Sequence, residues 1–393
     1  MKTQNTSAFQ NVLQRELQRI TNSWALLFLT IIGPALSIFL IVWIFSAGVP
    51  RDLPIAVIDL DRTVLSRKLT SMLDASPVVQ VHTNYSSLND AKKAIENGEV
   101  DAALYIPKDA ERTIYRGNST TTALYINNMN LVKGGLINSA VRKCIGTLSA
   151  GIKLQLQMKS GLRQEQAMSR IMPVVLRSVL LFNPYTSYSY YLTVSLLFIC
   201  LIVFTLLGSI YAIGDELYRG TGPKWIRLSG KNYIVAIVGK LLPYTVAYYS
   251  VAMIINIVLF YFIEVPVRGH LSSILIGELL LILSYQAMAI FLLTVTTNMR
   301  LSLSLGSGYC MLAITFCGLT FPVFGMTIFA QSIATVFPFT YWITILMGQS
   351  LRGEPIVNSI VPMYSLLVFV FFGLMFIPKL MHSMLNRKRW GKM

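Results

Sequence analysis

The sequence is poor in charge. Only 13% of its 393 residues are charged, against roughly 25% in soluble globular domains, and 54% are hydrophobic. The shortage is uneven, because residues 48–178 have an ordinary soluble composition whereas 24–47 and most of 179–381 are apolar. A bilayer core ~30 Å thick requires about 20 helical residues, so these apolar runs are long enough to cross it. The composition predicts a polytopic α-helical membrane protein.

Cysteine and histidine are scarce as well, with four cysteines and three histidines in the chain. Only Cys144 lies in the soluble-like segment, so that segment cannot hold an internal disulfide. The other cysteines lie in apolar runs, where a buried free thiol is expected. The sequence has no CxxC pair and no Cys/His cluster, so we expect no metal site.

Acidic residues are also few: 17 Asp and Glu accompany 33 Lys and Arg, which gives a net charge of +16. In a soluble protein such an excess can indicate nucleic-acid binding. Here the basic residues lie mainly in loops, in the tails and in the soluble-like segment, and no basic stripe with interleaved aromatic residues occurs. Membrane topology accounts for the charge, and nucleic acid is not an expected partner.

The amino-terminal region contains two predicted segments. Residues 1–23 are expected to form an amphipathic helix on the cytoplasmic surface, and a plain continuation of the first span is the alternative. Apolar side chains recur there at spacings of three and four: Phe9, Val12, Leu13, Leu17 and Ile20. Residues 24–47 are predicted to be the first transmembrane helix, because this run is longer than the about 7–15 residues of a signal-peptide core.

Residues 48–182 are predicted to be an extracytoplasmic α/β domain with a helical stalk. Strands are expected at Pro54–Leu60, Val78–His82, Ala102–Ile106 and Thr122–Ile126. Helices are expected at Thr63–Leu73, Leu88–Glu96, Asp109–Tyr115 and 131–180. Alternating strands and helices are typical of a layered α/β fold with a mainly parallel sheet.

Residues 183–381 are predicted to hold transmembrane helices two to six. The expected spans are 188–213, 233–262, 271–297, 301–321 and 358–381. Before the last span, residues 322–347 are almost free of charge and are interrupted at Phe337-Pro338. This segment either crosses the membrane or dips in and returns to the same side.

The distribution of basic residues decides between these topologies, because cytoplasmic loops are enriched in Lys and Arg. Basic residues crowd the amino terminus, the loop 214–232 and the tail 382–393, whereas the other short loops hold one each. Basic and bare loops alternate only if both termini are cytoplasmic. We therefore expect six transmembrane helices plus re-entrant half-helices over 322–347, where a broken helix is tolerated if it is buried in protein or lines a cavity.

The order of several motifs resembles that of type-2 ABC transporter permease subunits, in particular exporters with a large extracytoplasmic insert between the first two spans. The loop after span two, with Glu216-Leu217-Tyr218-Arg219-Gly220-Thr221, Ile226-Arg227-Leu228-Ser229 and Gly239-Lys240, is similar to that family's coupling loop. Three later stretches resemble its half-helices and the region before its last span: Leu319-Thr320-Phe321-Pro322, Phe337-Pro338-Phe339-Thr340-Tyr341 and Leu351-Arg352-Gly353. The resemblance covers nearly the whole chain and departs from the family at Gly214-Asp215, where Arg-Glu is common.

The resemblance implies an ATP-driven exporter that moves a lipid, a lipid-linked molecule or an amphipathic drug-like substrate out of the cytoplasm or inner leaflet of a bacterial inner (plasma) membrane. The chain has no Walker A loop, because Gly239-Lys240 is followed by Leu241 and no glycine lies five residues earlier. ATP and Mg²⁺ are therefore expected on a separate ABC ATPase subunit, and this chain is expected to bind no cofactor and to hold no catalytic residue.

Further partners follow from the same resemblance. A second permease chain, identical or a close paralogue, is expected to complete the pathway, because six spans are too few to enclose it. A periplasmic adaptor and an outer-membrane channel are further partners that the resemblance allows. The lipid bilayer surrounds the assembly.

The loop 214–232 is the only substantial internal cytoplasmic loop, so we expect it to contact the ATPase subunit. The candidate coupling residues are Glu216, Arg219, Gly220, Thr221, Trp225 and Arg227. The alternative is an ordinary basic loop that holds lipid headgroups.

The candidate residues of the translocation path are Glu278, Phe321, Pro322 and Tyr341. Glu278 is the only acid well inside a span, and a charge at the bilayer centre costs at least ~2.5–3.5 kcal/mol, so it should face a cavity or a partner. The alternative is a position near the outer interface, where Glu278 pairs with Arg268 or water.

Two other functions fit parts of the sequence. A non-transporting membrane receptor would use the insert to bind an extracytoplasmic ligand. A phosphatase would use Asp59 as nucleophile and Asp61 as acid/base, because Val57-Ile58-Asp59-Leu60-Asp61 resembles the first motif of haloacid-dehalogenase-type phosphatases. The insert has no Gly-Asp-x-x-x-Asp motif to hold Mg²⁺, which disfavours the phosphatase.

Overall fold

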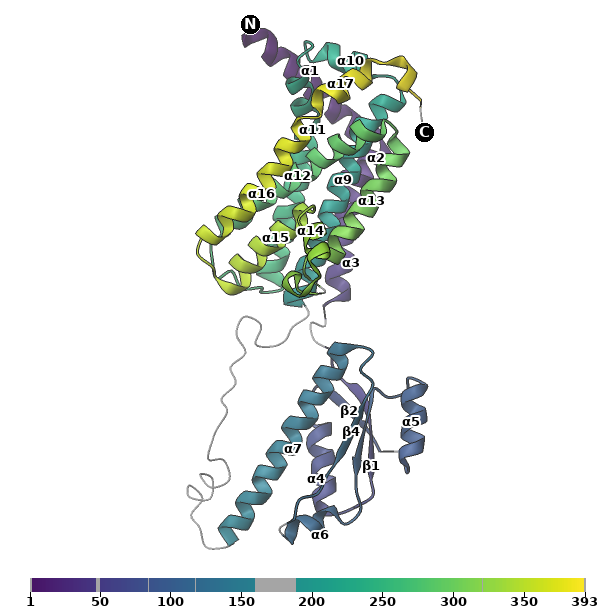
Figure 1. Ribbon diagram of the computed structural model, residues 1–393, viewed down its shortest axis with the longest axis vertical. Coiled ribbons are helices and arrows are strands. Elements are labelled where there is room, and N and C mark those ends of the chain that lie inside the picture. Colours follow the sequence, from purple (N-terminus) through teal and green to yellow (C-terminus); the bar gives the residue numbers. More distant parts are fainter. Residues whose placement is uncertain are drawn as a thin grey trace. The chain divides into compact units, whose positions relative to one another are not determined.

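The protein consists of two compact units. The computed structural model describes residues 2–46, 50–83, 85–116, 118–159, 189–319 and 321–391. The helical unit comprises Met1–Gly48 and Leu180–Met393, and the insert comprises Val49–Val179 (Figure 1). Among the described residues, five helices are long and apolar enough to cross a membrane, or six if one bent pair counts as a span. The chain is therefore a multi-pass helical membrane protein.

The amino-terminal helix packs on the helical unit through one face. Ala8, Val12, Glu16 and Ile20 are all buried, and their four-residue spacing places them on one side of α1 (Lys2–Asn22). Gly239 of α11 (Tyr233–Ile257) leaves room for this contact, since a Cβ atom there would lie 3.1 Å from Val12. The first span then continues through α2 (Trp24–Leu27), a π-helical turn (Phe28–Ile32) and α3 (Gly33–Ile44).

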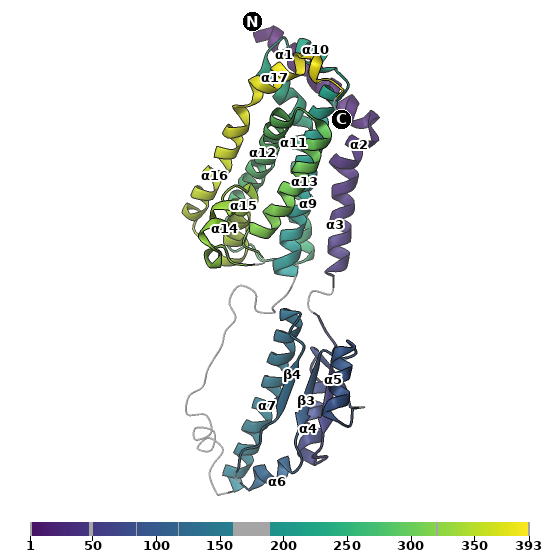
Figure 2. The ribbon, with the colours of Figure 1, turned by 45° about the vertical axis from the view of Figure 1, so that its right-hand side comes forward.

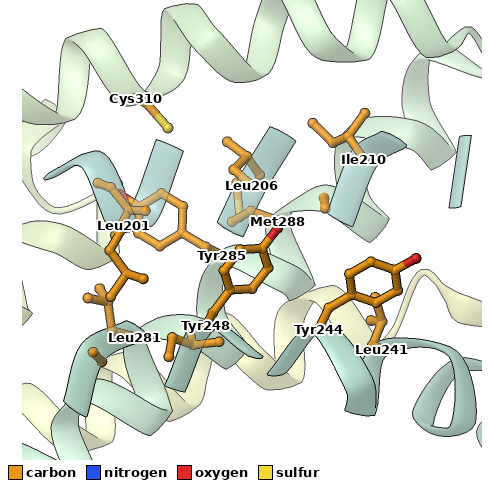
Figure 3. Packing of buried hydrophobic residues seen from close by; sticks show 14 of the residues in the cluster. Leu201, Leu206, Ile210, Leu241, Tyr244, Tyr248, Leu281, Tyr285, Met288 and Cys310 are labelled. Atoms are coloured by element: carbon orange, nitrogen blue, oxygen red, sulfur yellow. The ribbon is translucent and has the colours of Figure 1, made fainter. Parts of the chain in front are cut away.

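The core of the helical unit lies among the helices that follow the insert. These are α9 (Val194–Tyr218), α10 (Gly222–Leu228), α11, α12 (Leu271–Thr296), α13 (Met299–Phe316), α16 (Val357–Leu374) and α17 (Ile377–Leu385). Leu206 of α9, Tyr248 of α11, Tyr285 of α12 and Cys310 of α13 are buried together (Figure 3). Because α9 and α12 are the most buried of the candidate spans, they form the centre of the unit.

Four of the five spans predicted after the insert correspond to apolar helices, and the exception is the span predicted at 301–321. It is α13, which ends at Phe316 instead of residue 321 and is not among the five helices apolar enough to cross alone. Arg300, three serines and two glycines within its 18 residues account for its lower hydropathy.

A broken helix precedes the last span. It consists of α14 (Ile328–Ala334) and α15 (Pro338–Met347), which continues as a π-helical turn to Arg352, and the two parts are bent by 86°. The break falls at the predicted Phe337-Pro338, with Pro338 in the first turn of α15. The first half-helix begins later than the predicted residue 322, because Pro322 is followed by a 3₁₀ turn at Val323–Gly325.

The insert contains a four-stranded sheet in the order β2-β1-β3-β4. The strands are β1 (Leu53–Asp59), β2 (Val79–His82), β3 (Ala102–Ile106) and β4 (Ala123–Ile126). Strands β1, β2 and β3 are parallel and β4 is antiparallel to β3, so the sheet is mainly parallel, as predicted. Each strand begins and ends within one residue of its predicted range.

Helices cover both faces of this sheet (Figure 2). They are α4 (Val64–Asp74), α5 (Leu88–Glu96), α6 (Ala110–Tyr115) and α7 (Leu131–Lys159). Leu73 of α4 and Val141 of α7 pack in one apolar cluster, whereas Ala91 and Ala94 of α5 pack in the other. The predicted helix 131–180 is present to Lys159, and its remainder lies outside the described residues.

Close packing of α12 on α16 yields a first prediction. A Cβ atom on Gly373 would lie 2.6 Å from the Cα atom of Ala287, so the Gly373→Ala substitution must push two helix backbones apart. We expect the free energy of unfolding to fall by about 1–3 kcal/mol. Thermal unfolding of the purified full chain measures this. The matched control is Gly308→Ala, whose Cβ meets no atom within 4 Å; equal losses for both variants would contradict the packing.

Candidate functional site

A group of buried and partly buried charged side chains lies where α9 ends and meets α1 and α11. We call it the ionic cluster, and its members are Arg15, Glu16, Arg19, Asp215, Glu216 and Lys240. Glu16 enters the ionic cluster from the buried face of α1. Lys240 enters it from the first half of α11, near the end that is predicted to be cytoplasmic. The members from α1 lie about 200 positions before the others in the sequence, so the cluster joins distant parts of the chain.

Glu216 is the centre of the ionic cluster. Its Oε1 atom lies 2.7 Å from Arg19 Nη1, 2.8 Å from Arg15 Nη2 and 3.0 Å from Lys240 Nζ. The Thr221 hydroxyl donates a hydrogen bond to the other carboxylate oxygen. A single carboxylate thus connects α1, α9, α11 and the start of α10.

Lys240 is fully buried and makes two kinds of contact. Its Nζ atom lies 2.8 Å from Glu16 Oε1 and 4.7 Å from the ring centroid of Trp225, in a cation–π arrangement. The indole N–H of Trp225 donates to the carbonyl of Ala236, one turn before Lys240, at 3.2 Å. These contacts fix α10 against α11.

The ionic cluster is electrically balanced, because Arg15, Arg19 and Lys240 face Glu16, Asp215 and Glu216. Burial by itself would lower the pKa of Arg19, but the neighbouring Glu216 and Glu16 carboxylates raise the pKa above its ordinary value. The guanidinium therefore stays charged. Buried charges are tolerated only when they are paired and hydrogen-bonded, which this arrangement satisfies.

The predicted coupling residues fall into two groups. Glu216 and Trp225 are fully buried, so neither can touch a partner protein directly in this conformation. Arg219 and Arg227 are exposed, as is Lys224 between them, and Arg219 also pairs with Asp215 at 2.7 Å. We define the basic face as Arg219, Lys224 and Arg227. Burial thus moves two of the expected contact residues into the interior.

The two small residues of the predicted coupling loop have different neighbours. Gly220 adopts a φ of +67°, which favours glycine, and a Cβ atom there would lie 2.8 Å from the ring of Trp390. Thr221 turns inward to Glu216. Trp390 is held by a 3.0 Å hydrogen bond to the carbonyl of Met384 at the end of α17. Figures 1 and 2 show α1, α10 and α17 at the same end of the helical unit.

The candidate path residues differ in exposure. Glu278 is fully buried on α12 and accepts a 3.0 Å hydrogen bond from the amide of Asn256 on α11; its Oε1 atom has no partner within the described part of the chain. Phe321 and Pro322 are exposed, whereas Tyr341 is partly buried and donates to the carbonyl of Thr335 across the break between α14 and α15. Glu278 thus contacts Asn256, a partner that the sequence analysis did not name.

Two members of the ionic cluster were missed as charge partners, although the sequence carries a signal for both. Glu16 interrupts the apolar stripe Ala8–Val12–Ile20, and Lys240 lies inside an otherwise apolar span. A lone acid and a lone base at positions predicted to be buried should be considered as a pair. The loop sequence itself gave no sign that Trp225 points inward.

The two aspartates of the phosphatase-like motif are engaged in local structure. Asp59 accepts hydrogen bonds from the backbone of Asp61 and Arg62 and from the Ser66 hydroxyl. Asp61 accepts from the backbone N–H groups of Ala110 and Glu111. Both carboxylates therefore hold loops at the carboxyl edge of the sheet. Across the described ranges, no group of three or more His, Cys, Asp or Glu could hold a metal ion.

Comparison with known proteins gives one match. A family model described as "ABC-2 family transporter protein" matches residues 24–377. No curated protein matches the chain, and no solved structure matches it.

The ionic cluster yields a second prediction. Lys240→Met removes one cation and leaves Glu16 and Glu216 buried with less compensation, so we expect a loss of about 3–5 kcal/mol in the free energy of unfolding. Chemical or thermal unfolding of the full chain measures it.

The control is Arg219→Gln, which breaks an ion pair whose arginine side chain is 62% exposed. Water screens such a pair, so we expect a change below about 1 kcal/mol. A Lys240→Met variant as stable as the unsubstituted chain would show that the cluster does not hold the helices together.

Proposed function

This chain belongs to the ABC-2 transporter family, and from that premise we propose that it is the permease of an ATP-driven exporter for lipids, lipid-linked molecules or amphipathic drug-like compounds. Family membership makes it the membrane subunit of an ABC transporter and implies an ABC ATPase subunit as partner. The direction of transport, the substrate class and the manner of coupling are the parts that we propose.

The observation that carries the coupling proposal is the ionic cluster beneath the basic face. A force applied to α10 reaches Glu216 through Thr221 and reaches Lys240 through Trp225. Buried ion pairs are costly to separate, so α1, α9 and α11 should move together with α10. We propose that the ATPase subunit, which holds ATP and Mg²⁺, drives this block of helices.

The basic face is the proposed contact for the ATPase. Arg219 caps the end of α9 and Arg227 lies in the last turn of α10, and both are exposed. Asp215 orients Arg219. Positive side chains on such a surface would steer and orient an acidic surface of the partner. Glu216, Thr221 and Trp225 then act from below as the support of this surface, and Gly220 permits the turn between α9 and α10.

Hydrogen bonds around Gln349 support the proposed topology. The Gln349 side chain accepts from His270 N at 2.8 Å and donates to the Ser359 hydroxyl at 2.9 Å, and these residues lie at the starts of α12 and α16. Helices α12 and α13 are successive and antiparallel, so the last residue of α13 lies on the same side of the helical unit as the first residues of α12 and α16. The broken helix follows α13 directly. The segment thus enters and leaves on one side, which supports a re-entrant pair with α13 as the fifth of six spans.

The same topology supports an orientation in a bacterial inner membrane. The helices α1, α10 and α17 and the basic face share one end of the helical unit, which we propose to be cytoplasmic by the positive-inside rule. The first span ends opposite, so the insert is proposed to lie outside. A periplasmic adaptor and an outer-membrane channel would then have access to it.

We propose that α13 forms the contact with a second permease chain, identical or a close paralogue. Its exposed face mixes apolar residues, among them Leu301, Leu305, Met311 and Leu312, with small and polar ones, namely Ser304, Ser307, Gly308 and Thr315. Lipid is a poor environment for these groups, whereas small and hydroxyl residues suit helix–helix contacts in membranes. The translocation route would follow this interface.

The outer part of the proposed route is apolar. Phe321, Phe324, Ile328 and Phe329 are exposed around Pro322 and the start of α14. Such a lining suits alkyl chains and amphipathic molecules. We propose Phe321, Pro322 and Tyr341 as path residues, and we propose that Glu278 acts chiefly with Asn256 to fasten α11 to α12.

A membrane receptor is the alternative function, and the two functions differ in what the coupling loop must do. The Arg219→Glu/Arg227→Glu double variant reverses two charges of the basic face. We expect at least a tenfold loss of the ATPase subunit that co-purifies with the tagged chain from native membranes, and a rise in cellular accumulation of an amphipathic dye.

The matched control is Arg352→Glu, which reverses an exposed arginine before α16, at the other end of the helical unit. It should leave both the ATPase yield and dye accumulation unchanged. Normal ATPase binding by the double variant would contradict the proposed docking face. Equal dye accumulation in cells with and without the chain would favour the receptor.

The dimer proposal predicts a specific cross-link. In a chain whose four natural cysteines are replaced by serine, Gly308→Cys should form a covalent dimer on mild oxidation in membranes, because this position has open space and faces the proposed partner. Val361→Cys, on the exposed face of α16, is the control and should stay monomeric. Equal dimer yields on a denaturing gel would contradict an interface at α13.

A further inference from the structure

The insert contains a cavity of about 330 Å³ between α4, α6 and α7. Its walls are mainly aliphatic and come from all three helices: Leu65, Leu69, Ile114, Leu148, Ile152 and Leu156. Leu65, Ile114, Leu148 and Leu156 are only partly buried, so the described residues of the insert leave apolar side chains uncovered here. Exposed apolar concavities on a folded domain usually mark a binding site.

The position of this cavity in the sheet is that of a ligand site. Ile106 and Pro107, at the carboxyl end of β3, line it together with Asp61, just beyond the carboxyl end of β1. Strands β1 and β3 are parallel neighbours, and the chain leaves them toward opposite edges of the sheet, to β2 and to β4. Open α/β sheets bind ligands in the crevice at such a switch point.

The charges along the cavity determine which headgroup it can accept. The Asp61 carboxylate is already used, because it accepts from Ala110 N at 2.9 Å, from Glu111 N at 3.0 Å and from the Thr63 hydroxyl at 2.7 Å. Lys153 of α7 is exposed and is the only basic residue among the lining residues described. The cavity therefore combines an apolar interior with one available positive charge.

We propose that this cavity binds a single-chain amphiphile, with its alkyl or acyl chain between α4 and α7 and its anionic headgroup at Lys153. A volume of about 330 Å³ is at the lower limit of ligand pockets, about 300–1,000 Å³, so it accommodates one aliphatic chain. A partner helix, about 10 Å across with its side chains, is too wide for it. The site lies outside the proposed translocation path, and its occupation requires neither ATP nor the ATPase subunit.

Photolabelling of the full chain in lipid nanodiscs tests the proposal. The probe is dodecanoate with a diazirine near the end of its chain. We expect saturable labelling of peptides from α4 and α7, which unlabelled dodecanoate displaces. Because each methylene contributes about 0.8 kcal/mol when it is buried, each methylene removed from the competitor should weaken displacement about fourfold.

Two variants separate the apolar and the charged parts of the site. Leu148→Trp fills the cavity and should reduce saturable labelling at least tenfold. Lys153→Glu leaves the apolar walls unchanged, so it should weaken labelling by the dodecanoate probe about tenfold while strengthening labelling by the corresponding dodecylamine probe. Lys143→Trp and Lys143→Glu, on an exposed position of the same helix outside the lining, are the controls and should label normally.

Absence of saturable labelling in the insert of the unsubstituted chain, or normal labelling of both variants, would overturn the proposal. Equal labelling by a two-chain phosphatidic acid probe would overturn the commitment to a single chain and identify membrane lipid as the occupant. These measurements use no ATPase subunit, so their failure leaves the proposed coupling untouched. A failure of the docking variants likewise leaves this site untouched.

Discussion

The structure of the helical unit depends on the pairing of Glu216 with Arg19 and Lys240. Nitrogen atoms of Arg19, Lys240 and also Arg15 each lie within 3.0 Å of the same oxygen, Glu216 Oε1. The side chains of Glu216 and Lys240 are fully buried. An unpaired charge at this depth would be very costly, so each helix that supplies one is constrained by the others. The amphipathic helix α1 is thereby made an integral part of the transmembrane core.

This constraint also explains the form of the coupling loop. The segment α10 has only seven residues and could not hold its orientation by itself, since isolated short helices are unstable in water. Trp225 lies under Lys240, Thr221 binds Glu216, and the glycines at 220 and 222 allow Trp390 and Met384 to pack closely above them. The basic face consequently stands on a support that reaches directly into the spans, as the proposed coupling requires.

Much of this architecture could be predicted from local sequence patterns, and the limits have identifiable causes. The short β-rich runs of the insert and the proline at position 338 determine structure within a few residues, so the strands and the helix break were placed well. The ionic cluster joins residues about 200 positions apart, and no local pattern shows that Trp225 and Glu216 turn inward. The end of α13 was misplaced because apolarity continues to Leu319 although the helix stops at Phe316.

Two carboxylates also hold structural elements in place in the insert, but they bind backbone and hydroxyl groups instead of cations. Asp59 and Asp61 resemble a catalytic pair in sequence, yet their oxygens accept backbone and hydroxyl hydrogen bonds that fix the starts of α4 and α6. Asp61 binds the first backbone N–H groups of α6, so it fixes the start of a helix that lines the cavity. The Asp61 carboxylate thus has a structural role beside a cavity whose lining is mainly aliphatic and includes one lysine, Lys153.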